Sequence, residues 1–139
     1  MKVLAVLFVC MTFLSGCSSV QSDRNPRVDL SRLKRFYVEH RLSDNHQVDE
    51  TIVAELRKRG FEASAGPLTM MPQETDALVT YQDEWAWDFK SYLFQLHIEI
   101  GNPHKNQRYA YGTFRQPTPV PKPLPEVVSL LFAQMLNQR

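Results

Sequence analysis

Two neighbouring segments in the second half of the chain alternate between large apolar and polar residues. They cover residues 77–87 and 92–100, and only residues 88–91 separate them. A period of two is typical of strands with one buried face, so the pattern predicts an antiparallel hairpin that turns at 88–91. A slip of one residue would move every large apolar side chain to the polar face, so the pattern strongly specifies the register.

The predicted register places the large apolar groups on one face of the hairpin. From the turn outward, the predicted pairs are Trp87 with Tyr92, Trp85 with Phe94, Tyr81 with Ile98, and Val79 with Ile100. The opposite face then collects a set of polar residues that we predict to be an exposed interaction surface: Gln82, Glu84, His97 and Glu99.

Asp83 does not fit this pattern, because it falls opposite Leu96 on the apolar face. A carboxylate there is costly unless it is paired or hydrogen-bonded. A bulge that turns it outward, a place at the strand margin, or a bond to a backbone or Trp N–H would each resolve the conflict. A functional acid with a raised pKa is the alternative.

Two helices are predicted. Residues 46–59 carry apolar side chains at helical spacing, with acidic residues in the first turn, basic ones in the last and Gly60 just beyond. A second helix should begin near Pro125, because apolar residues again recur at helical spacing up to Met135. Between 117 and 125 every second residue is proline. That connector should run as extended polyproline II, with docking in an aromatic groove as an alternative role.

With further strands predicted at 33–38, 61–64 and 107–115, the elements suggest a single α/β (α+β) domain over residues 31–139. The expected architecture is a two-layer sandwich. One layer is a mainly antiparallel sheet of four to five strands, and both helices lie on its aromatic face. We leave the register of the strand at 107–115 open.

The amino-terminus has the pattern of a secretory signal over residues 1–16. Lys2 precedes an apolar series and small residues follow it, and the segment is too short to span a bilayer. It ends in Leu-Ser-Gly before Cys17, which resembles the bacterial lipobox. The resemblance implies diacylglycerol transfer to the Cys17 sulfur and cleavage after Gly16. An ordinary signal peptide with a chance cysteine is the alternative.

Ser18, rather than aspartate, follows Cys17. In bacterial lipoproteins this implies the outer membrane, with the domain on its periplasmic face; the inner membrane and the cell surface are the alternatives. Residues 17–30 are polar and lack periodicity, so we predict that the lipidated cysteine is followed by a flexible tether with a reach of about 20 Å.

Composition argues against several classes of function. Sixteen Lys and Arg become fifteen once Lys2 leaves with the signal, against fifteen Asp and Glu, and this balance argues against a nucleic-acid partner. Cys10 leaves as well and Cys17 becomes a thioether, so no thiol is available for a disulfide, a nucleophile or a metal.

The sequence also lacks the common catalytic motifs. None of the four histidines, at positions 40, 46, 97 and 104, has the spacing of a metal-binding pair. We therefore assign no catalytic, cofactor-binding or metal-binding residue and predict that the protein is not an enzyme. A general base or hard-metal site at His97 beside Glu84 and Glu99 is the alternative.

One family resemblance covers most of the chain. It is carried by the lipobox, the first strand, a helix that ends in Leu-Arg-Lys-Arg-Gly-Phe at 56–61, the segment Asp-Ala-Leu-Val-Thr-Tyr at 76–81, and the carboxy-terminal helix. Together these resemble small Gram-negative lipoproteins of unassigned function, with a layout similar to the auxiliary lipoproteins of ABC-type envelope transporters. Such a family implies no catalytic residues.

Two functions remain open. The first is a membrane-anchored adaptor or accessory subunit in envelope assembly or transport, which binds a partner protein through the polar sheet face, an edge strand or the proline segment. The second is a carrier for a small lipid or glycan. A carrier needs an apolar cavity lined by the helices and by Tyr81, Trp85 and Phe94, whereas an adaptor would have those side chains close-packed.

Overall fold

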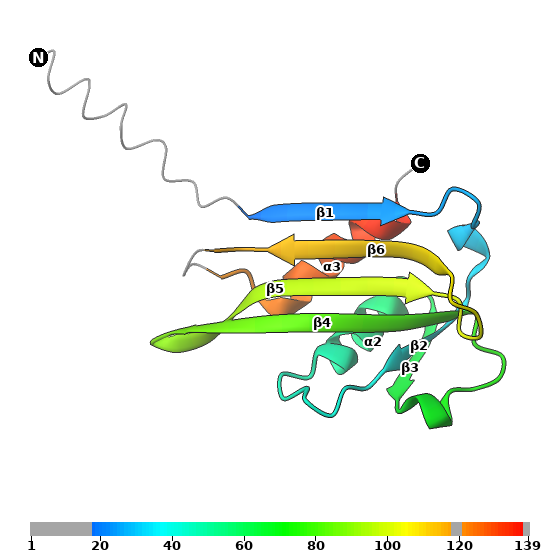
Figure 1. Ribbon diagram of the computed structural model, residues 1–139, viewed down its shortest axis with the longest axis horizontal. Coiled ribbons are helices and arrows are strands. Elements are labelled where there is room, and N and C mark those ends of the chain that lie inside the picture. The colour runs from blue at the N-terminus through cyan, green and yellow to red at the C-terminus, as the bar shows by residue number, and fades with distance from the viewer. Residues whose placement is uncertain (1–17, 118–120, 138–139) are drawn as a thin grey trace, which may run out of the picture.

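The computed structural model describes residues 18–117 and 121–137, which form a sheet in front of two helices (Figure 1). The strands are β1 (Ser19–Arg24), β2 (Arg35–Glu39), β3 (Glu62–Gly66), β4 (Ala77–Asp88), β5 (Lys90–Gly101) and β6 (Arg108–Arg115). The helices are α2 (Val48–Lys58) and α3 (Leu124–Leu136), with short 3-10 turns η2 (Leu30–Arg32) and η3 (Leu68–Met70). The predicted α+β class is confirmed.

The sheet has six strands in the order β1-β6-β5-β4-β2-β3, so the prediction of four to five strands is wrong. The four strands from β1 to β4 pair antiparallel. β2 pairs parallel with both β4 and β3, and α2 provides the crossover between β2 and β3. The parallel pairing of β2 with β3 follows from this β-α-β unit, because strands joined by a helical crossover run in the same direction.

The additional strand is β1, and it lies inside the segment predicted to be a flexible tether. It pairs with β6 from Ser19 opposite Arg115 to Arg24 opposite Ala110, and Val20 packs against the core. The prediction of a tether over 17–30 is therefore wrong for Ser19–Arg24. A short polar edge strand is held mainly by its backbone hydrogen bonds, and these leave little trace in a side-chain pattern.

The β4–β5 hairpin follows the predicted register over most of its length. Val79 lies opposite Ile100, Tyr81 opposite Ile98 and Asp83 opposite Leu96, as predicted. All of the apolar members of these pairs are buried.

The register shifts by one residue between Glu84 and Trp85, because β5 accommodates one extra residue, Phe94, as a bulge. Trp85 lies opposite Leu93 and Trp87 opposite Ser91, so the predicted pairing of each Trp is wrong. Leu93 takes the buried position instead of Phe94. Beyond the bulge, the hairpin extends past the helices (Figure 1), and Trp87 is 76% exposed.

Asp83 is accommodated by two donors just before the bulge. Its Oδ2 accepts a 2.7 Å hydrogen bond from Nε1 of Trp85, and its Oδ1 accepts a 3.2 Å charged bond from Nη1 of Arg41. A bond to a Trp N–H was one of the predicted solutions. The carboxylate and the bulge therefore belong together: Asp83 stabilises the Trp85 ring where the register changes.

Both helices pack on the same face of the sheet (Figure 1). α3 comes so close to β6 that a Cβ at Gly112 would lie 3.1 Å from Cδ2 of Leu131. Gly60 ends α2 with a φ of 91°, the left-handed conformation predicted for it. No helix in residues 18–117 and 121–137 is long and apolar enough to cross a membrane.

The proline-rich connector 117–125 is described in part, since residues 118–120 lie outside the described residues. Buried Gln116 holds its start, because Nε2 donates to the carbonyl of Leu93 over 2.8 Å and Oε1 accepts from the backbone N–H of Lys122 over 3.1 Å. Pro123 precedes α3 in an extended conformation, and Pro125 lies in its first turn.

We expect Asp83→Ala to lower the free energy of unfolding by about 1–3 kcal/mol, because it leaves the N–H of half-buried Trp85 without its acceptor and removes the carboxylate that pairs with Arg41. Urea unfolding followed by tryptophan fluorescence measures the change. The neighbouring exposed residue provides the control, since Glu84→Ala should stay within about 0.5 kcal/mol. Equal effects of the two substitutions would contradict the structural role of Asp83.

Candidate functional site: the open face of the sheet

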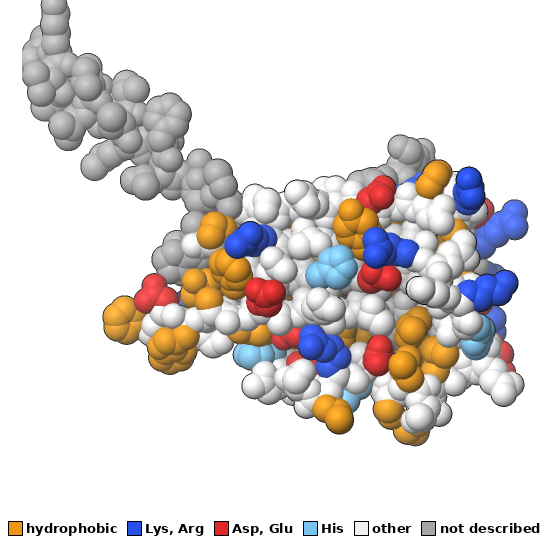
Figure 2. Space-filling model, in the orientation of Figure 1, with side chains coloured by type: hydrophobic (Ala, Val, Ile, Leu, Met, Phe, Trp, Pro, Cys, Tyr) orange, Lys and Arg blue, Asp and Glu red, His pale blue; other side chains and the backbone are white. Residues whose placement is uncertain are grey.

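The face of the sheet that points away from the helices carries polar side chains in register across four strands. Strand pairing sets them in three cross-strand rows. The rows are Ser19-Arg115-Gln95-Glu84, Gln21-Thr113-His97-Gln82 and Asp23-Tyr111-Glu99-Thr80. We call these twelve residues the open face. None of the described helices covers it, and positive, negative and histidine side chains are interspersed on it (Figure 2).

The four residues predicted as an interaction surface all lie on the open face. Gln82 and Glu84 are exposed, and His97 and Glu99 are half-buried. Gln82 lies directly opposite His97, whereas Glu84 lies opposite Gln95 in another row. The structure therefore brings His97 and Gln82 together and keeps Glu84 apart from Glu99.

His97 stands at the centre of a hydrogen-bonded group. Its Nδ1 lies 2.6 Å from Oγ1 of Thr113, and its Nε2 lies 4.0 Å from Oε2 of Glu99. Nε of Arg108 donates to the same Glu99 oxygen over 3.0 Å, and its guanidinium lies 5.0 Å from the centre of the Tyr111 ring. The group presents an imidazole, a carboxylate and a guanidinium side by side, which suits hydrogen bonding to a polar partner surface.

Three members of this group come from β6 and were not predicted: Arg108, Tyr111 and Thr113. The sequence indicated a strand there but left its register open. The signal that could have placed Tyr111 and Thr113 is Gly112, because a residue without a side chain suits the face on which α3 packs. That choice puts Tyr111 and Thr113 on the opposite, open face.

A second polar cluster lies between the sheet and the start of α2, around Asp44. The carboxylate accepts a 2.7 Å hydrogen bond from the Tyr81 hydroxyl. It also accepts hydrogen bonds of 2.9 to 3.2 Å from three backbone N–H groups, those of His46, Val48 and Asp49. It caps α2, because residue 47 before the helix offers no side-chain cap.

The same contacts shift two pKa values in opposite directions. Burial acts to raise the pKa of Asp44, but the hydrogen bonds from Tyr81 and the backbone outweigh it, and the pKa is lowered. Burial, and then the hydrogen bond to Asp44, raises the pKa of Tyr81. These are the signs of a structural cluster: a charged carboxylate holds a neutral phenol.

The residues expected to line a carrier cavity contact other protein groups. Tyr81 is 3% exposed and bonded to Asp44. The Trp85 ring stacks on His46 with 3.7 Å between ring centres. Phe94 is half-buried beneath the Arg115 guanidinium, 5.0 Å away.

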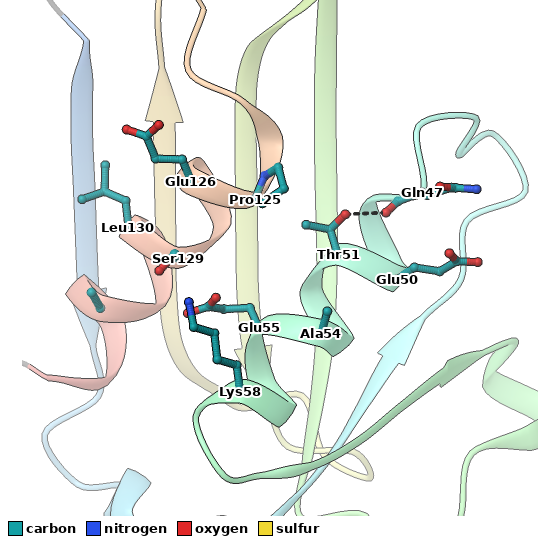
Figure 3. A pocket seen from close by; sticks show the side chains of 11 residues that line it. Gln47, Glu50, Thr51, Ala54, Glu55, Lys58, Pro125, Glu126, Ser129 and Leu130 are labelled. Carbon is teal, nitrogen blue, oxygen red and sulfur yellow. Dashed lines mark hydrogen bonds between the residues drawn. The ribbon is translucent and has the colours of Figure 1, made fainter.

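An open groove of about 850 Å³ runs between α2 and α3 on the helical side (Figure 3). It is lined by mixed polar and small side chains, among them Glu50, Ala54 and Lys58 of α2 and Glu126 of α3. At the end of α2, Arg59 bridges the helices: Nε bonds Glu55 over 2.7 Å and Nη2 donates to the carbonyl of Ser129 over 3.0 Å. The volume lies within the range of small-ligand sites.

Across the described ranges, no group of three His, Cys, Asp or Glu side chains is placed to hold a metal ion. His97 has Glu99 nearby, but Glu84 lies in a different row, so the structure does not form the His97–Glu84–Glu99 constellation considered from the sequence. Cys17, the predicted lipidation site, lies outside the described residues.

No protein-family model matches the sequence, and no curated protein matches it. Solved structures do share its fold. A PelC dodecamer from Paraburkholderia phytofirmans and a single-substitution variant of it each align with a TM-score of 0.59 and 15% identity, over 85% of this chain and 94% of theirs. A PDZ domain protein from Parabacteroides distasonis aligns with a TM-score of 0.55 and 14% identity, over 94% of this chain and 39% of its own.

We expect Asp44→Asn to lower the free energy of unfolding at pH 7 by about 1–2 kcal/mol, because a charged cap is lost. The pKa of Asp44 is lower in the folded chain than the usual value near 3.9. Its stabilisation is therefore complete above that value and disappears as the pH falls through the folded pKa.

Urea unfolding at neutral pH and below pH 4 checks this linkage. The gap between the native protein and the Asp44→Asn variant should narrow in acid. Asp88→Asn at the exposed hairpin tip is the matched control and should leave the pH dependence unchanged. A gap that stays constant across the pH range would contradict the charged cap.

Proposed function

We propose that this protein is a membrane-anchored envelope lipoprotein that acts as a non-enzymatic adaptor and binds a partner protein through its open face. The observation that carries the proposal is the asymmetry of the sheet. One face is closed by α2 and α3, whereas the other presents four adjacent strands of ordered polar side chains to solvent. An ordered polar face that none of the described helices covers is available to bind a partner.

The chemistry of the open face suits a protein partner. His97, Glu99 and the Tyr111 ring lie on it next to Arg108, so together they offer donors, acceptors and one aromatic surface within a small area. Interfaces are enriched in Tyr and Arg. Positive and negative side chains are interspersed on the open face. This mixture suits a partner surface with both kinds of charge better than it suits a strongly charged ligand.

The packing of the aromatic face favours the adaptor over the carrier. Tyr81 and Trp85 are held by Asp44, His46 and Asp83, so a ligand would have to displace these contacts to enter between sheet and helices. The groove between α2 and α3 favours the carrier as a second candidate, because its volume suits a small ligand.

The structural likeness to a PelC dodecamer supports a further form of the adaptor proposal, in which the partner is another copy of this chain. A self-assembled ring or a complex with a different protein would both occupy the open face. Crosslinked products that contain only this chain, at multiples of its mass, identify the first, and a product in which mass spectrometry finds a second protein identifies the second.

The proposed anchor is a lipid on Cys17, with the domain on the periplasmic face of the outer membrane. β1 begins at Ser19, so only Ser18, and hence two residue steps, join the anchor to the folded sheet. They span at most about 7 Å. This is far shorter than the reach of the tether that the sequence suggested, and it would hold the domain directly against the bilayer.

We expect Cys17→Ser to release the protein from membranes or to leave it unprocessed, because the acyl acceptor is missing. Membrane fractionation and the mass of the amino-terminal peptide measure this. Cys10→Ser, a cysteine in the predicted signal, is the control and should leave anchoring intact. Normal cleavage and unchanged membrane association of Cys17→Ser would overturn the anchor.

A photo-crosslinking amino acid at exposed Gln82 should capture the partner in cells, because Gln82 lies beside His97 on the open face. The same amino acid at exposed Ala54, in the groove on the helical side, is the matched position. A specific product at Gln82 alone supports the adaptor. A product at Ala54 alone, or at neither position, contradicts it.

A further inference from the structure

We propose that the tip of the β4–β5 hairpin is a second membrane contact that inserts Trp87 and Phe89 into the lipid interface. This rests on the proposed anchor at Cys17 for its orientation. The two rings are 76% and 95% exposed. Figure 2 shows apolar side chains at the end of the molecule where this hairpin projects. Large apolar side chains gathered at a projecting tip mark an interaction site rather than incidental exposure.

The tip lies at the same end of the sheet as the proposed anchor. Ser19, Arg115, Gln95 and Glu84 form one row across four strands. β1 begins at this row, and the β4–β5 hairpin turns beyond it at the same end of the sheet (Figure 1). The lateral separation from β1 to β4 is three strand spacings, about 14 Å. One bilayer surface can therefore meet both.

The lengths of the two projections match insertion at the interface. Beyond the row, β4 continues for four residues from Trp85 to Asp88, which is about 13 Å of strand. The two residues from Ser19 back to Cys17 reach at most about 7 Å. The tip therefore reaches at least about 6 Å farther from this row than the link can, which is comparable with the 5–10 Å to which interfacial apolar groups are buried.

The turn itself has an unusual residue for its geometry. Phe89 has a φ of 58°, in the left-handed region where hairpin turns favour Gly or Asn. A bulky ring there is unfavourable in the free protein and gains nothing from packing, because it is almost fully exposed. Contact with lipid accounts for an aromatic residue at this position.

The small extent of the tip favours a lipid surface over a protein partner. Each ring offers roughly 150–250 Å² of area, whereas a specific protein interface usually buries more than about 1,000 Å². Trp is also enriched where membrane meets water, because its ring is apolar and its N–H is polar. Two rings are enough for a second membrane contact, because the proposed acyl chains on Cys17 already anchor the protein.

The test uses the full, processed protein purified from membranes and reconstituted into phosphatidylcholine–phosphatidylglycerol vesicles that contain brominated lipid. The chain has two tryptophans, and half-buried Trp85 is held against the domain by His46 and Asp83. The difference in emission between the native protein and the Trp87→Phe variant is the signal of Trp87, and the emission that remains in the variant is the signal of Trp85. We expect the Trp87 signal to be quenched at least about twofold more than the Trp85 signal. Phe89→Ser should reduce the quenching.

Each outcome decides between the two proposals. If the mass of the amino-terminal peptide shows acylation but Trp87 is not quenched, the tip proposal fails and the anchor stands. If Cys17 carries no lipid but Trp87 is quenched, the anchor fails and the tip stands. A Trp87 signal that shifts to the blue with protein concentration and resists the brominated lipid would assign the tip to a second copy of the chain and overturn the lipid contact.

Discussion

The register shift between Glu84 and Trp85 divides the β4–β5 hairpin into a part that belongs to the core and a part that projects from it. On the side of the shift away from the turn, alternation places Tyr81, Leu96 and their neighbours in the buried core. Beyond it, toward the turn, the hairpin extends past both helices and carries Trp87 and Phe89 into solvent, whereas Trp85 stays half-buried. Asp83 stabilises the junction, because its carboxylate satisfies the Trp85 N–H and Arg41 at once. A polar residue on the apolar face thus satisfies two donors beside the bulge.

Side-chain periodicity predicted the elements whose formation depends on burial. The hairpin register at Val79 and Tyr81 and the helix that ends before Gly60 are correct, because each element buries a continuous apolar stripe. β1 was not predicted, since its residues are held through the backbone by β6. The pairing of Trp85 and Trp87 was wrong, because one extra residue in β5 shifts the pairing beyond Glu84, and the apolar residues at 92, 93 and 94 suit either register.

The candidate site was predictable to a similar extent. Strand alternation alone identified Gln82, Glu84, His97 and Glu99, because residues two apart in a strand share a face. It could not identify Arg108 or Thr113, whose contacts with Glu99 and His97 depend on which residue of β6 pairs with which residue of β5. That choice is made by close packing of α3 on Gly112, a contact between residues nearly twenty positions apart.

The anchor and the hairpin tip together would set the orientation of the open face. If both touch one bilayer, the strands stand upright on it and the open face points sideways. His97 lies two residues below the row that includes Glu84, so it would sit about 20 Å from the tip, counted along the strand. At that height a partner approaches from the side, above the lipid headgroups. Two membrane contacts also prevent rotation about a single anchor, which would otherwise scatter the directions in which His97 and Arg108 are presented. The short link to Cys17 and the hairpin tip would thus fix the height and the direction of the open face above the membrane.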